Sequence, residues 1–260
     1  MHSCSSAMDS TIWFITGISL ERPDWAWRSR IRFGKMESRK AFTDEDRQCV
    51  IERDAFRYRQ YGHSEKSLGW GEKGRQSLRY QVLAENWDLS DKVVLDIGAG
   101  FGDFYQQLQS SVKGYIGLEL LEEFVKQGNE LYGKNKNFSL TQADVSELDP
   151  FPECDVAFIS GLFNFKLLKG ENYIFIEEIL RKAFDASKVG VAANFITDRV
   201  DFMDPLIFYS SPESILKIVL GMTKRYAISQ SYFPFEFSVF LHKDDAFDKS
   251  KALFMNIAER

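Results

Sequence analysis

The feature that most constrains the fold is a short apolar strand that runs directly into a glycine-rich turn. Residues 93–97 read Val-Val-Leu-Asp-Ile, and residues 98–102 read Gly-Ala-Gly-Phe-Gly. A short apolar run of this kind is typical of a buried strand in a parallel sheet. Glycines directly after it let the backbone adopt conformations closed to other residues and approach a ligand closely. The stretch therefore predicts a ligand-binding turn between a strand and a helix.

The spacing of these glycines separates two kinds of binding turn. The dinucleotide fingerprint G-x-G-x-x-G requires its third glycine at position 103, but this chain has Asp103 there and its glycine at Gly102. A nicotinamide-dependent oxidoreductase is therefore the less favoured interpretation.

After Asp91 the chain alternates short apolar runs with amphipathic segments. This order is typical of an α/β fold with a doubly wound, mostly parallel sheet. Ser211 and Pro212 resemble an N-cap and a first-turn proline, so a helix is expected to run to about Met222. The expected strands are 93–97, 115–120, 138–142, 155–160 and 189–196, with helices at 102–111, 121–132 and 177–186. Segments 226–232 and 235–242 are expected to add a C-terminal antiparallel hairpin.

Residues 44–90 are expected to form an N-terminal helical cap or lid ahead of a catalytic domain at 91–260. Helices at 44–59 and 73–87 flank a connection rich in glycine and aromatic residues, including Tyr61 and Trp70. Glycines permit hinge motion and aromatic side chains can close a pocket, which favours a mobile lid over a permanently packed cap. Residues 1–43 have no clean period and are expected to be a poorly ordered extension or residues added to the natural chain.

The order Asp96, then Gly98-x-Gly100-x-Gly102, is similar to the first motif of class I S-adenosylmethionine-dependent methyltransferases. In that family the turn wraps the methionine part of the cofactor. The resemblance extends over about residues 91–243 and implies a Rossmann-like fold, S-adenosylmethionine as cofactor, and methyl transfer as the activity.

Further motifs follow at the separations that this family has. Glu119 ends the second expected strand, where the family holds an acid that accepts both ribose hydroxyls, and Asp144 corresponds to the acid near the adenine amine. Ser160 ends the fourth strand, which faces both cofactor and acceptor. The cofactor-binding residues that the resemblance implies are Asp96, Gly98, Ala99, Gly100, Gly102, Glu119, Leu120, Asp144, Val145 and Ser160.

Two residues upstream of the first motif are further candidates for the cofactor site. Arg79 has a guanidinium that could pair with the cofactor carboxylate, or it could be a solvated arginine on a helix face. Trp70 is a candidate contact as well, although a packing role is the favoured interpretation.

Methyl transfer mainly requires that the acceptor be aligned with the sulfonium methyl group and that water be excluded. A general base is needed only if the acceptor loses a proton, and His63 and His242 are the first candidates. The sequence after the fourth strand lacks the Asp/Asn-Pro-Pro-Tyr/Phe motif of amino-methylating DNA enzymes. A small organic acceptor with a reactive oxygen or nitrogen is therefore expected. The alternatives are a cofactor-binding protein without methylation and an aminopropyl-type transferase.

Composition agrees with a cytoplasmic enzyme. The formal net charge is −5 and no run of Lys or Arg suggests a nucleic-acid groove. Three widely separated cysteines, Cys4, Cys49 and Cys154, indicate neither a disulfide framework nor a metal site, and no metal is expected. The apolar stretch at 12–20 is too short and too interrupted for a membrane anchor or signal peptide.

Overall fold

The computed structural model describes residues 40–69, 75–109 and 111–243. All of these residues belong to one compact unit, residues 38–260. Most of the N-terminal extension expected at 1–43 therefore lies outside the described residues. No helix in the described part is long and apolar enough to cross a bilayer.

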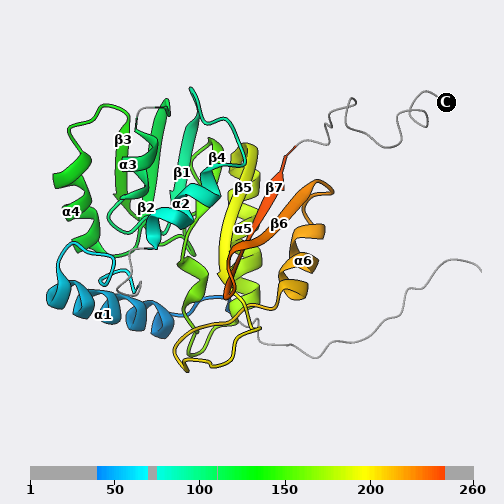
Figure 1. Ribbon diagram of the computed structural model, residues 1–260. Coiled ribbons are helices and arrows are strands. Elements are labelled where there is room, and N and C mark those ends of the chain that lie inside the picture. Colours follow the sequence, from blue (N-terminus) through cyan, green and yellow to red (C-terminus); the bar gives the residue numbers. More distant parts are fainter. Residues whose placement is uncertain (1–39, 70–74, 110, 244–260) are drawn as a thin grey trace, which may run out of the picture. The chain divides into compact units, whose positions relative to one another are not determined.

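The centre of this unit is a seven-stranded sheet in the order β3-β2-β1-β4-β5-β7-β6 (Figure 1). The first five strands run parallel, and β6 and β7 form an antiparallel hairpin that pairs with β5. The strands are β1 (Val93–Ile97), β2 (Gly114–Glu119), β3 (Phe138–Gln142), β4 (Cys154–Ile159), β5 (Ser187–Ile196), β6 (Tyr226–Phe233) and β7 (Glu236–His242). The predicted doubly wound sheet with a terminal hairpin is confirmed. The order reverses between β1 and β4, which is where ligands of open α/β sheets bind.

Helices cover both faces of this sheet because successive strand residues alternate between the faces. Leu95 and Ile97 pack with α5 and α6 in one core cluster, whereas Val94 packs with α2 and α3 in the other. The helices are α1 (Asp44–Tyr61), α2 (Gln76–Ala84), α3 (Phe104–Leu108), α4 (Glu122–Tyr132), α5 (Asn172–Ala186) and α6 (Pro212–Leu220), with a 3-10 turn at Leu162–Asn164.

Several helix ends differ from the sequence-based expectation. Helix α5 begins at Asn172 rather than at residue 177, because its buried residues already start with Phe175 and Ile176. Helix α3 is shorter than the expected 102–111, and α2 occupies only part of 73–87. The expected cap of α6 is present, since Ser211 Oγ accepts from Ser214 N at 3.3 Å and Pro212 follows it.

Helix α1 lies across the carboxyl ends of the parallel strands (Figure 1). Its start is held by Asp46, a fully buried residue that accepts from the backbone N–H groups of Lys169 at 3.1 Å and Gly170 at 2.8 Å and also from Leu168. Just before the helix, the Phe42 ring stacks on Phe175 with centroids 5.1 Å apart. The boundary expected at residue 43 therefore falls inside a packed segment, because an apolar contact and a helix cap precede Asp44.

Candidate active site

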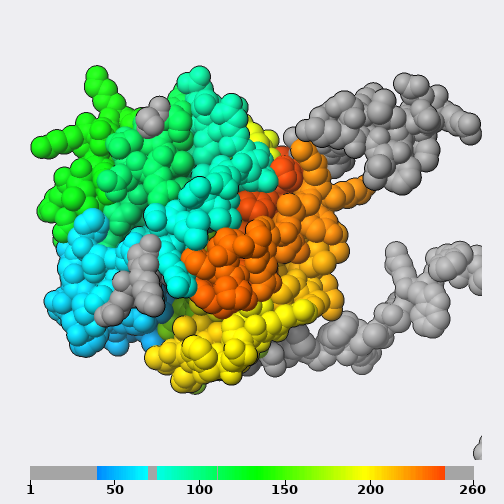
Figure 2. Space-filling view, in the orientation of Figure 1, coloured from blue at the N-terminus to red at the C-terminus, as the bar shows by residue number. Residues whose placement is uncertain are grey.

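A cavity of about 480 Å³ lies at the carboxyl ends of the strands. Its walls come from the glycine turn after β1, the ends of β2 and β4, helices α1 and α2, and segment 204–207. Figure 2 shows the surface of α1 (blue) beside that of the segment around residue 200 (yellow), below the orange hairpin. The cavity therefore lies at the switch point of the sheet, with α1 over one side of it.

The turn after β1 places backbone rather than side chains against the cavity. Gly98 and Gly100 line it with φ values of +74° and +59°, which side-chain-bearing residues rarely adopt. A Cβ on Gly100 would lie 2.7 Å from a methyl carbon of Leu68, so the loop after α1 packs directly over the turn. Gly102 does not line the cavity. It packs against the Phe138 ring, which a Cβ on Gly102 would approach to 3.0 Å.

Asp96 lies behind the turn and not in the cavity wall. Its carboxylate is buried and accepts from the Tyr115 hydroxyl at 2.5 Å. Burial raises the pKa of Asp96 to about 7, and the Tyr115 hydrogen bond only partly offsets this. Asp96 does not line the cavity as the structure describes it, and its hydrogen bond to Tyr115 joins β1 to β2, so its contact with a cofactor stays a prediction.

Glu119 is the polar group at the end of β2. Its Oε2 accepts from Gly100 N at 2.9 Å and its Oε1 accepts from Leu121 N at 2.8 Å, so the carboxylate joins two neighbouring turns. It lines the cavity although it is buried, and burial raises its pKa to about 7 against the effect of these hydrogen bonds. Each carboxylate oxygen has a second lone pair, so both remain able to accept from hydroxyl groups of a ligand.

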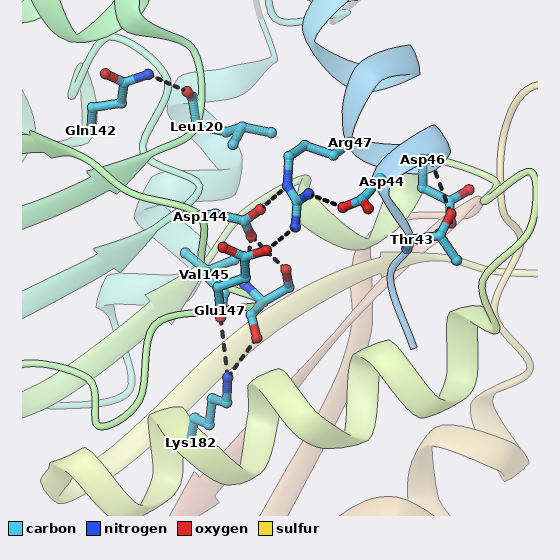
Figure 3. A network of polar contacts seen from close by, with 11 residues as sticks. Thr43, Asp44, Asp46, Arg47, Leu120, Gln142, Asp144, Val145, Glu147 and Lys182 are labelled. Carbon is cyan, nitrogen blue, oxygen red and sulfur yellow. Dashed lines mark hydrogen bonds and ion pairs between the residues drawn. The ribbon is translucent and has the colours of Figure 1, made fainter. Parts of the chain in front are cut away.

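Asp144 lies at the centre of a polar network between β3 and α1 (Figure 3). Its Oδ2 accepts from Arg47 Nε, and its Oδ1 accepts from Ser146 N at 2.8 Å. Arg47 also pairs with Asp44 and with Glu147, the latter at 2.5 Å. Burial opposes ionisation of Asp144, but the hydrogen bonds from Ser146 and Arg47 outweigh it and lower its pKa. Arg47 thus ties α1 to the acid after β3, a contact that the sequence analysis missed.

Arg79 lines the cavity, but its guanidinium is already engaged. Its Nε donates to Glu236 Oε1 at 3.0 Å and Oε2 at 2.8 Å, and Nη2 contacts the same carboxylate. Both side chains are almost completely buried. Arg79 is therefore not the solvated arginine on a helix face that was considered from the sequence, and its pairing with a cofactor carboxylate stays a prediction. A buried pair between α2 and the start of β7 needs residues 157 positions apart, which local spacing does not reveal.

The two candidate histidines do not line the cavity. His63 Nε2 lies 2.9 Å from Asp103 Oδ1, and its ring packs edge-on against Phe101. His242 ends β7 opposite Gly190, at the amino end of the parallel strands, with Trp87 Nε1 3.4 Å from its Nδ1. His242 is therefore at the wrong end of the sheet for a role in this cavity, and His63 lies behind the glycine turn.

The remaining expected cofactor residues are distributed as follows. Ala99, Leu120, Val145 and Ser160 all line the cavity, whereas Trp70 lies outside the described residues. The sequence analysis did not identify a row of α1 residues that also line it: Val50, Arg53, Asp54 and Arg57. Their helical spacing was visible, but only the packing of α1 shows that this face meets a cavity.

The described residues contain no group of three or more His, Cys, Asp or Glu side chains placed to hold a metal ion. The polar groups of the cavity are instead carboxylates, guanidinium groups and backbone N–H groups, which suit an organic ligand with hydroxyl and charged groups.

Part of the chain is similar in sequence to a known protein family. Residues 94–183 match a family model described as a methyltransferase domain. A sequence search among curated proteins finds no significant match.

Several solved structures share this fold, and three of them contain bound S-adenosylhomocysteine. Magnesium protoporphyrin IX methyltransferase (ChlM) from Synechocystis PCC 6803 with bound SAH has 13% identity and a TM-score of 0.56, covering 75% of this chain and 100% of that one. A DhpI–SAH complex has 12% identity and a TM-score of 0.57, covering 76% and 97%. Phosphoethanolamine N-methyltransferase 1 from Haemonchus contortus, with phosphoethanolamine and S-adenosylhomocysteine, has 14% identity and a TM-score of 0.60, covering 84% and 55%. At these identities the likeness establishes the shared fold.

Proposed function

We propose that this chain is an S-adenosylmethionine-dependent methyltransferase that transfers the cofactor's methyl group to a small organic acceptor in the cavity, which the match of residues 94–183 to a methyltransferase domain and the shared fold support. The observation that carries the proposal is the position of Glu119. This carboxylate faces the same cavity as the glycine turn and bonds to the turn through Gly100 N.

The residues around the cavity fit S-adenosylmethionine. Gly98 and Gly100 leave room for a ligand to approach the backbone, in keeping with the methionine part of the cofactor. Glu119 offers two acceptor oxygens for the ribose hydroxyls, and Asp144 lies where the adenine end is expected. Ala99, Leu120, Val145 and Ser160 complete this part of the wall.

When bound, the cofactor supplies a sulfonium methyl group that is already electrophilic. The protein then has to orient the acceptor and exclude water. Holding the two reactants in the right geometry lowers the activation barrier. Helix α1 and segment 204–207 contribute to the walls of the cavity, so they can limit the access of solvent. Of the carboxylates that line it, Asp54, Asp144 and Glu236 are paired with arginines, and Asp204 accepts from Leu206 N at 2.8 Å. An acceptor atom that is already deprotonated is therefore favoured, because it needs no base.

A small molecule is also favoured over a macromolecule as the acceptor. The structural neighbours include an enzyme in complex with phosphoethanolamine, and this chain carries a net charge of −5, which opposes binding to nucleic acid. Cys49 and Cys154 are free thiols, as is typical of a reducing cytoplasm.

Incubation of the full chain with trideuteromethyl-labelled S-adenosylmethionine and a metabolite extract tests the proposal. Mass spectrometry should find an acceptor that has gained one labelled methyl group, together with S-adenosylhomocysteine. Production of methylthioadenosine instead would indicate aminopropyl transfer and contradict methylation. Calorimetry with S-adenosylhomocysteine and with NAD should give binding only for the former.

A further inference from the structure

We propose that Arg57 of α1 binds an oxyanion of the methyl acceptor, a carboxylate or a phosphate, at the end of the cavity away from Asp144. This inference rests on the proposed methyl transfer and names the substrate class that the same site would take.

Helix α1 presents two arginines to the cavity on one face. Arg53 and Arg57 are one turn apart, and both line the wall. Arg47, six residues before Arg53, is paired with Asp144, so α1 is fixed at one end of the cavity while the later arginines face the other.

Arg53 already has its partners. Its Nε donates to Asp54 Oδ1 at 2.8 Å and its Nη2 donates to Asp54 Oδ2 at 3.0 Å. Its guanidinium also lies 4.3 Å from the centre of the Phe165 ring. Both oxygens of Asp54 therefore accept from Arg53, and the one negative charge of Asp54 lies closest to that arginine.

Arg57 is the arginine with unfilled donors. Its guanidinium has five N–H donors, and within the described part of the chain the sole carboxylate within 4 Å is Asp54, with Nη1 to Oδ1 at 3.7 Å. Burial lowers the pKa of Arg57, and the positive charge of Arg53 lowers it further. A partly desolvated cation beside a like charge is stabilised by an anion that accepts from its fork.

Gly69 lies against Arg57 in space and leaves room for its guanidinium. Gly69 has φ +78°, and a Cβ there would lie 2.6 Å from Arg57 Nη1. The guanidinium therefore packs against bare backbone between the loop after α1 and the cavity. A side chain at residue 69 would push it away.

The other charged groups on this side do not neutralise Arg57 by contact. Asp204 attracts it at longer range, but Asp204 is exposed and its Oδ1 accepts from Leu206 N at 2.8 Å. Arg79 and Glu236 neutralise each other. Arg53 and Arg57 therefore share the single negative charge of Asp54, and Arg57 is the more distant of the two at 3.7 Å.

The surroundings indicate what the rest of the acceptor is like. Phe165, Ile207 and Leu206 line the same end, so an apolar or aromatic body suits it. Asn164 Oδ1, also at the cavity, is buried and has no hydrogen-bond partner in the described part of the chain, so a donor group on the acceptor would satisfy it.

Calorimetry on the full chain saturated with S-adenosylhomocysteine tests this with three aromatic probes: benzoate, phenyl phosphate and neutral benzamide. We expect at least one oxyanion probe to bind about tenfold or more tightly than benzamide, because hydrogen bonds to charged groups are the stronger kind. Preference for benzoate would identify a carboxylate acceptor and preference for phenyl phosphate a phosphate. Arg57→Gln should lose this preference but keep its affinity for S-adenosylhomocysteine.

Two variants control the experiment. Arg59→Gln makes the same change at an exposed position of the same helix and should bind all probes as the wild type does. Arg57→Lys keeps the charge without the fork and should retain part of the preference, which keeps the test valid if Arg57→Gln fails to fold.

Three results would overturn the inference. The first is wild-type protein with no preference for either oxyanion. The second is undiminished preference in Arg57→Gln. The third is a parallel loss of S-adenosylhomocysteine affinity in that variant, which would assign Arg57 to the cofactor. Wild-type protein that does not bind S-adenosylhomocysteine at all would overturn the proposed function as well, so the two failures are distinguishable.

Discussion

Glu119→Gln should weaken binding of S-adenosylhomocysteine and change how that binding depends on pH. The substitution keeps the size of the side chain and removes its charge. In the structure both carboxylate oxygens accept from backbone N–H groups, those of Gly100 and Leu121. A glutamine has one acceptor oxygen, so its NH₂ group must face one of these two donors.

The expected loss of affinity for S-adenosylhomocysteine follows from the hydrogen bonds that the variant cannot make. Hydrogen bonds from ribose hydroxyls to a charged group are worth about 1.5–3 kcal/mol, which corresponds to about ten- to a hundredfold in affinity. Burial raises the pKa of Glu119 from 4.5 to about 7. Hydroxyl donors favour the ionised form, so wild-type affinity should rise as pH increases towards and through 7. The variant cannot titrate at this position and should lack that rise.

The raised pKa of Glu119 also makes the free energy of unfolding depend on pH. The folded, ligand-free protein holds a proton on Glu119 more readily than the unfolded chain does, so its free energy of unfolding should fall as pH rises from about 4.5 to about 7. A pKa raised from 4.5 to about 7 corresponds to about 3 kcal/mol as an upper bound. Glu119→Gln should lack this part of the pH dependence, although donor–donor conflict destabilises it at every pH.

Calorimetric titration with S-adenosylhomocysteine and urea unfolding, each from pH 5 to 8, measure both effects. Glu122→Gln is the matched control, because Glu122 is exposed in the first turn of α4 and pairs with the exposed Lys126 at 2.7 Å. A folded Glu119→Gln with wild-type affinity across this range would remove Glu119 from the cofactor site and refute the reasoning.

Three further predictions concern α1. Asp46→Ala should lower the free energy of unfolding by about 3 kcal/mol or more, because it leaves buried N–H groups of segment 168–170 without an acceptor; a loss below about 1 kcal/mol in urea unfolding would contradict this. Arg47→Gln should free α1 from Asp144 and speed hydrogen exchange in residues 47–61, whereas unchanged exchange would show that the ion pair does not hold the helix. S-adenosylhomocysteine should slow exchange at residues 58–69 as well as 96–102, since Leu68 packs over Gly100; protection confined to 96–102 would rule out a lid.

The position of Asp46 restricts what a lid at this site can be. Because its carboxylate ties the start of α1 to segment 168–170, the first turn of the helix should be protected from exchange before any ligand is added. Movement is therefore expected in the later part of α1 and in the loop up to Gly69, not in the whole helical segment 44–90 proposed from the sequence.

The positions of the strands along the chain could be predicted, because a buried strand has a local pattern of apolar residues. Val94 and Leu95 are fully buried on opposite faces of the sheet, so β1 reads as an uninterrupted apolar run. The turn at Gly98 and Gly100 was predictable for a similar reason, since positive φ strongly favours glycine. Glu119 and Asp144 were predicted from the resemblance to the methyltransferase family, which holds an acid after each of these strands.

Contacts between distant residues were not predictable in this way. Arg79 meets Glu236 across 157 positions and Arg47 meets Asp144 across 97, and nothing in the local pattern of either arginine indicates its partner. The histidines illustrate the opposite error: their chemistry suits a base, but β7 carries His242 to the amino end of the parallel strands. The sequence alone therefore determined the sheet and the glycine turn, because hydrophobic period and backbone conformation are local properties. Only the tertiary structure decided which charges meet at the cavity, because that depends on where α1, α2 and the terminal hairpin pack.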